Sequence, residues 1–173
     1  MNKKFELLPD DTIEVFGRTH FRIKAKINFG TVGTGELGGY IEKEENLSEN
    51  GNAWVTGDAT VSGDAEVSGN ATVSGDATVS GNAWVSGDVE VSGDAEVSGD
   101  ACVTSQKDYI VFKNSWSSFR WFTYTKSNKM WRVGCFYGTG QELIKKAYED
   151  SEQSGKCYEA YVNLVLELEK LDD

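Results

Sequence analysis

The sequence predicts a mainly β protein whose centre is a parallel β-helix of six-residue turns. One six-residue phrase recurs nine times without a break between Gly51 and Thr104, and a fixed short period is typical of a solenoid. Each copy places an aliphatic residue and Val two residues apart, so that both point to one side of a short strand. Gly followed by Asp or Asn supplies the corner, because these residues tolerate the positive φ of a tight turn.

Written from its valine, the unit is Val-Ser-Gly-Asp-Ala-x, which resembles the hexapeptide-repeat, left-handed parallel β-helix family. The resemblance implies a triangular prism with three hexads per coil and with Val and Ala filling the bore. Extending the frame backwards puts Leu37 in the valine position and Ile41 and Leu47 in the alanine position. The β-helix is therefore expected to begin near Leu37 and to have almost four coils.

Three segments are expected along the chain. Residues 1–36 form an N-terminal β-hairpin cap, with strands at 12–16 and 19–27. Residues 37–104 form the left-handed β-helix. Residues 105–173 form a small C-terminal α+β domain of three strands and two helices.

The strands of the C-terminal domain are expected at 109–113, 119–125 and 130–137, with a hairpin turn at 126–129. Thr139 and Glu142 have the spacing of a capping box, which opens a helix that runs to about Ser151. A second helix follows Ser154 and Gly155, with an apolar side that includes Tyr158 and Val162.

The lead-in to the repeat, Gly35 to Ser48, reads GELGGYIEKEENLS. This phrase resembles the lead-in of a group of phage and prophage β-helix proteins, and the resemblance extends more loosely to the last segment. It implies a phage-encoded protein.

Charge is distributed unevenly along the chain, whose net charge is -11. Residues 31–104 hold one Lys or Arg against fourteen Asp or Glu, whereas residues 105–173 hold ten of each. The acidic β-helix is therefore not expected to bind nucleic acid directly and suits a basic protein partner. The N-terminus lacks the apolar run of a signal peptide and no segment is long enough for a membrane span, so a cytoplasmic location is expected.

No catalytic residue, metal site or cofactor is expected. The acyltransferases of the hexapeptide family use a histidine base on the prism, usually beside a projecting loop, but His20 is the single histidine and lies in the cap. The related carbonic anhydrases need three zinc-binding histidines. The three cysteines have no metal-like spacing and indicate reduced thiols. Asp and Asn alternate at the repeat corner, which favours a turn role over a calcium ladder.

The best candidate for a ligand site is the aromatic and basic stretch from Lys107 to Tyr137, which holds six Lys or Arg, one acid and ten aromatic residues. One face of its second strand is expected to show four candidate residues, with a fifth on the next strand: Arg120, Phe122, Tyr124, Lys126 and Arg132. Flat rings beside cations suit a base and its phosphates. The alternative is that these rings form the core of a small sheet.

Two tryptophans, Trp54 and Trp84, occupy outward positions on different faces of the prism. Exposed tryptophans suggest contacts with other chains. The scaffold family is commonly trimeric, and the resemblance implies a homotrimer.

These observations favour a non-enzymatic phage anti-defence protein. It would sequester a nucleotide immune signal or block a host immune protein complex. A degenerate hexapeptide acyltransferase and a structural virion or assembly component are the alternatives.

Overall fold

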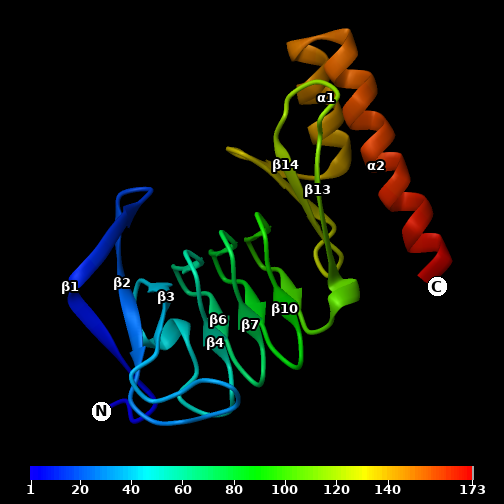
Figure 1. The fold of residues 1–173 in the computed structure, drawn as a ribbon. Coiled ribbons are helices and arrows are strands. Elements are labelled where there is room, and N and C mark those ends of the chain that lie inside the picture. Colours follow the sequence, from blue (N-terminus) through cyan, green and yellow to red (C-terminus); the bar gives the residue numbers. More distant parts are fainter. Residues whose placement is uncertain (173) are drawn as a thin grey trace. The chain divides into compact units, whose positions relative to one another are not determined.

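The computed structural model describes residues 1–172 and divides the chain into two compact units (Figure 1). Unit 1 contains residues 1–109 and 125–128, and unit 2 contains residues 110–124 and the described chain from Lys129 onward. The expected fold class is confirmed: the protein is mainly β, with a β-solenoid of about four turns and a C-terminal helical region.

Each hexad of the solenoid contributes a two-residue strand that ends in valine. The strands are β4 (Trp54–Val55), β5 (Thr60–Val61), β6 (Glu66–Val67), β7 (Thr72–Val73), β8 (Thr78–Val79), β9 (Trp84–Val85), β10 (Glu90–Val91), β11 (Glu96–Val97) and β12 (Cys102–Val103). Successive turns are joined by backbone hydrogen bonds from one residue to the carbonyl 17 positions later, as from Trp54 to Ala71 at 3.0 Å. The corner glycines stack closely. A Cβ added to Gly69 (φ +67) would lie 2.9 Å from the nitrogen of Gly87.

The solenoid strands align in three parallel sheets, in the register that the 18-residue coil predicts. Trp54 pairs with Thr72 and Thr72 with Glu90, and the other two sheets repeat this pattern with β5, β8 and β11 and with β6, β9 and β12. The Val of every hexad, and the Ala or Val two positions before it, is at most 2% exposed. The apolar bore is therefore continuous.

The first coil departs from the expected frame. Ile41 pairs with Val61 and Leu47 bridges Val67, so both occupy the valine position rather than the alanine position. Leu37 is 52% exposed and lies outside the bore. The cause is the segment between Leu47 and Val55, which is two residues longer than a hexad spacing and shifts everything before it. This coil also holds the 3-10 helix η1 (Glu44–Asn46).

The N-terminal hairpin is continuous with one sheet of the solenoid. β1 (Phe5–Val15) pairs with β2 (Arg18–Ala25), which pairs with β3 (Leu37–Ile41), and the sheet order is β1-β2-β3-β5-β8-β11. Phe16 and Gly17 form the hairpin turn, with φ of 49° and 75°. The first strand is longer than the expected 12–16 and begins at Phe5.

The C-terminal part holds a four-stranded sheet and two helices. The strands are β13 (Tyr109–Lys113), β14 (Trp121–Thr125), β15 (Met130–Val133) and β16 (Phe136–Gly138), in that order, and β13 follows the 3-10 helix η2 (Gln106–Asp108). The expectation of three strands is wrong, because Gly134 adopts a positive φ of 56° and turns the chain between β15 and β16. The helices are α1 (Gly140–Asp150) and α2 (Glu152–Asp172).

The capping box that opens α1 is present: Thr139 Oγ1 accepts a hydrogen bond from the Glu142 N–H at 3.3 Å, and Glu142 Oε2 accepts one from the Thr139 N–H at 2.8 Å. None of the helices in residues 1–172 has the length and apolar character needed to cross a bilayer. All three cysteines are free thiols.

Candidate functional site

Two of the five expected ligand residues lie in the core of unit 2. Phe122 is 0% and Tyr124 5% exposed, and both face the helices. Tyr124 Oη donates to Glu169 Oε1 at 2.6 Å, and burial together with this carboxylate raises the pKa of the phenol. The expectation that Phe122 and Tyr124 form an exposed ligand face is therefore wrong, and the alternative of an aromatic core holds for them.

The reason lies in the helices, which pack an apolar cluster against one side of the sheet. The buried cluster joins strand and helix residues: Phe122, Tyr124, Trp131, Val133, Leu143, Ala147, Tyr158, Val162 and Val165. Since side chains alternate along a strand, Trp121 and Thr123 face the other way, where Trp121 is exposed and Thr123 is buried.

The three expected cations lie on different elements. Arg120 precedes β14 and lines a pocket of about 300 Å³ in unit 2, together with Lys146 and Phe136. Lys126 lies in the turn after β14 and belongs to unit 1. Arg132 alternates with the buried Trp131 and Val133 and so lies on the sheet face opposite the helices.

That opposite face, here called the open face, carries two rings and two cations: Lys113, Trp121, Arg132 and Tyr137. Of these four residues the sequence reasoning expected Arg132 and missed the other three. Lys113 Nζ lies 5.6 Å from the centre of the Trp121 ring, a cation–π distance. Arg132 on β15 is in register with Tyr137 on β16. Trp121 and Tyr137 are each 38% exposed. Two rings and two cations are therefore carried on one face of the sheet.

The two solenoid tryptophans differ in exposure. Trp84 is 48% exposed, and its Nε1 donates to Ser68 Oγ at 3.0 Å. Trp54 is only 3% exposed, because Phe29 from the segment before β3 packs edge-on against it at 5.3 Å between ring centres. The expected exposure of Trp54 is therefore wrong, and Trp84 alone of the pair offers a ring to a partner.

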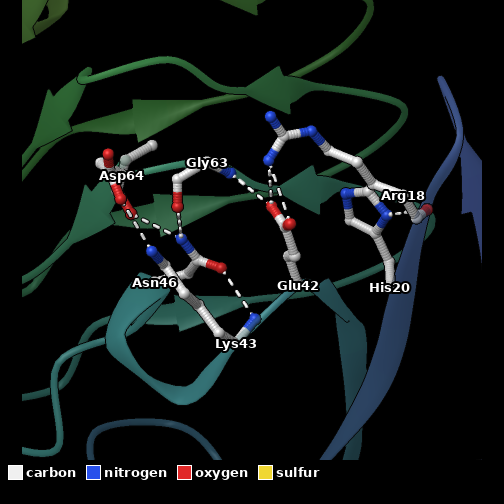
Figure 2. Close-up of polar contacts among 8 residues, drawn as sticks. Arg18, His20, Glu42, Lys43, Asn46, Gly63 and Asp64 are labelled. Carbon is white, nitrogen blue, oxygen red and sulfur yellow. Dashed lines mark hydrogen bonds and ion pairs between the residues drawn. The ribbon is translucent and has the colours of Figure 1, made fainter.

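A polar cluster joins the N-terminal hairpin to the first turns of the solenoid (Figure 2). Arg18 Nη1 donates to both oxygens of Glu42, at 3.0 and 2.9 Å, and the Gly63 N–H donates to the same carboxylate at 2.6 Å. These contacts, that of Gly63 first, hold the pKa of Glu42 below its ordinary value. Lys43 pairs with Asp64 at 2.8 Å. The cluster fixes the hairpin to the second coil.

Two buried residues complete this junction. Asn46 is 0% exposed, and its Nδ2 donates to the carbonyls of Gly63 and Ala65 at 3.1 and 2.8 Å. His20 is 1% exposed, with its Nδ1 3.0 Å from the Arg18 carbonyl. A base for acyl transfer must reach its substrate, and a ring so enclosed does not reach solvent. The contacts of this junction hold the N-terminal hairpin against the solenoid.

Residues 1–172 contain no group of three or more His, Cys, Asp or Glu side chains placed to hold a metal ion. The open face is the candidate binding site because of the side chains that it carries. It has flat rings for stacking and cations for anionic groups.

Comparison with known families finds a match that lies within the repeat. The family model described as the YdcK β-solenoid repeat matches residues 65–80 and 73–87. No curated protein matches the sequence. The repeat and the solenoid together define the chain as a β-helix repeat protein.

Proposed function

We propose that this β-helix protein is a phage-encoded, non-enzymatic binding protein whose C-terminal sheet captures a nucleotide. By binding the nucleotide, the protein would keep an immune signal away from the host's defence proteins. The single observation that supports this most is the open face, where Lys113 stands over Trp121 and Arg132 is in register with Tyr137.

Stacking and charge pairing explain why this face suits a nucleotide. Every base has a π-face that stacks on an aromatic ring, with about 1 to 3 kcal/mol per base. Arginine binds phosphate oxygens with a planar fork of N–H donors. A ligand with a base on Trp121 or Tyr137 would place its phosphates near Lys113 or Arg132. An uncharged aromatic ligand would use the two rings of the open face but not its two cations.

The rest of the proposal concerns the solenoid. We take it as a left-handed hexapeptide β-helix that assembles into a homotrimer in the cytoplasm of the infected cell, with the exposed Trp84 as a contact residue. In a second form of the same idea, the acidic solenoid blocks a basic groove on a host immune complex, since its charge is strongly negative.

Calorimetry with a panel of cyclic and linear nucleotides tests the proposal. Trp121→Ala should weaken binding by about 1 to 3 kcal/mol through lost stacking. Arg132→Glu should weaken it at least as much, because repulsion of phosphate replaces attraction. Added salt should weaken binding by the wild type.

Two variants serve as matched controls. Trp84→Ala removes an exposed tryptophan from the solenoid, and Arg120→Glu reverses a charge away from the open face. Both should bind as the wild type does. Absence of nucleotide binding by the wild type would reject the capture model. Inhibition of a host nuclease complex by that same protein would then favour the blocking form.

A further inference from the structure

Helix α2, the orange-to-red helix of Figure 1, carries a second apolar stripe besides the one that faces the core. The core stripe consists of Tyr158, Val162 and Val165. The second stripe consists of residues spaced by four, three, four and three positions: Cys157, Tyr161, Leu164, Leu168 and Leu171. This alternation is the a/d spacing of a helix that pairs with another helix.

The second stripe is exposed from Leu164 onward, whereas Cys157 and Tyr161 are partly buried, with one side against the core cluster. Leu164 is 50%, Leu168 42% and Leu171 84% exposed. At its N-terminal end, Trp116 borders a groove of about 390 Å³ that is also lined by Cys157, Tyr161 and Leu164. Trp116 itself is 76% exposed. An apolar strip that ends in an aromatic groove is a surface for a partner helix.

We propose that the occupant is a second copy of this chain, with the two α2 helices packed antiparallel around a two-fold axis. In this register Tyr161 packs on Leu164 of the second copy, and Cys157 packs on Leu168 of the second copy. Leu171 of each copy then enters the groove beside Trp116 of the other. Every stripe residue thereby gains a partner on an isologous contact.

Charge complementarity selects this direction and register. Lys156 and Glu167 flank the same edge of the stripe, eleven positions apart. The antiparallel register brings Lys156 of one copy next to Glu167 of the other, and symmetry makes this pair twice. A parallel arrangement would hold the two residues about 16 Å apart along the axis, too far to pair.

Both charges are free to exchange partners at little cost. Lys156 now pairs with Glu152 at 2.7 Å and Glu167 with Lys170 at 2.7 Å, all with side chains at least 67% exposed. Such surface pairs contribute about 0 to 1 kcal/mol. Because the stripe holds only five residues, we expect a weak contact that depends on protein concentration in the micromolar range.

Cysteine crosslinking tests the register directly. In a background with Cys102→Ser and Cys135→Ser, Leu168→Cys should form a disulfide with Cys157 of the second copy on mild oxidation, because their Cβ atoms would face one another. The product should run as a covalent dimer without reductant. Leu166→Cys is the matched control: Leu166 is 43% exposed but lies off the stripe, so its variant should remain uncrosslinked.

Light scattering tests the contact without crosslinking. The α2 contact is two-fold and separate from the contact of the proposed homotrimer, so it joins either two single chains or two trimers. In both cases Leu168→Glu should halve the wild-type mass at micromolar concentration, and Leu166→Glu should leave it unchanged. Lys156→Glu and Glu167→Lys should each weaken association, and the double variant should restore it. The proposal is overturned if Leu168→Cys forms no covalent dimer, if Leu166→Cys crosslinks equally well, or if the stripe variants keep the wild-type mass. A wild type that does not associate also overturns it.

Discussion

The solenoid and unit 2 both enclose an apolar core, but they specify it in different ways. In the solenoid all nine hexads bury Val together with Ala or a second Val, and the strands from β4 to β9 make the same hydrogen bonds to the next turn. In unit 2 the core is a set of unlike aromatic rings, such as Phe122 and Tyr158 at 4.7 Å or Phe112 and Tyr161 at 4.8 Å between ring centres. The core of the solenoid follows from the repeat, whereas the core of unit 2 depends on how the helices meet the sheet.

The largest expected effect is a charge inside the bore. Val73 is 0% exposed, and Val73→Asp would bury a carboxylate with no partner, which costs several kcal/mol and unfolds the solenoid. Thr72→Asp, one residue away on the outward side, should stay folded. Chemical denaturation followed by circular dichroism measures both. Equal stability of the two variants would contradict the in-and-out alternation of the repeat.

The next effect concerns the two sides of strand β14. Phe122→Ala should lower the free energy of unfolding by about 3 to 5 kcal/mol, because it leaves a cavity between sheet and helices. Trp121→Ala removes a larger side chain from the open face and should lower it much less. Denaturation monitored by tryptophan fluorescence and circular dichroism compares them. The reverse order would mean that Trp121, not Phe122, lies in the core.

The same contrast explains how much the sequence could predict. In the repeat, nine hexads show the same pattern, so the inward-facing positions can be predicted from many independent copies. The register of Trp54, Thr72 and Glu90 is as expected. The frame fails only where the repeat fails, between Leu47 and Val55, where two extra residues enter the turn. The frame before the repeat rested on a few hydrophobic residues placed in repeat positions, and these could not reveal the insertion.

In unit 2 each strand occurs only once. The alternation of side chains along a strand defines two faces of the sheet, but it does not show which face the helices cover. The choice depends on α1 and α2, which follow later in the chain. Phe122 and Tyr124 align with Trp131 and Val133, and this apolar match was the available signal for the core side. The sequence prediction grouped Arg120 and Arg132 with Phe122 and Tyr124, whose rings are buried in the core. Likewise, only the folded chain places Phe29 over Trp54.

A third prediction concerns the N-terminal end of the solenoid, where Lys4 is 1% exposed. Its Nζ donates to the carbonyls of Ser48 and Ala53 at 3.0 and 2.6 Å. Burial lowers the pKa of Lys4 from 10.5 to about 8. Between these two values the unfolded chain binds more protons than the folded chain, so the free energy of unfolding should rise with pH from about 8 to 10.5.

Denaturation at several pH values checks this rise. The difference between the wild type and Lys4→Met should change across the same window, because tyrosine titration is common to both proteins and cancels. A difference that stays constant from pH 8 to 10.5 would mean that Lys4 carries an ordinary pKa.

The smallest expected effect compares two corners of the solenoid. At one corner Asn70 Nδ2 donates to Asp88 Oδ1 at 2.7 Å, one turn later. At another corner the equivalent stack is Asp58, Asp76 and Asp94, all acceptors of like charge. Asp76→Asn should therefore raise the free energy of unfolding by about 0.5 kcal/mol, since the new amide can donate to Asp94. Asn70→Asp should lower it by a similar amount, because it removes a donor and adds a repulsion. Paired denaturation curves with and without calcium measure both changes. Calcium-dependent stability in the wild type that disappears in Asp76→Asn would show instead that the acidic corner is an ion site.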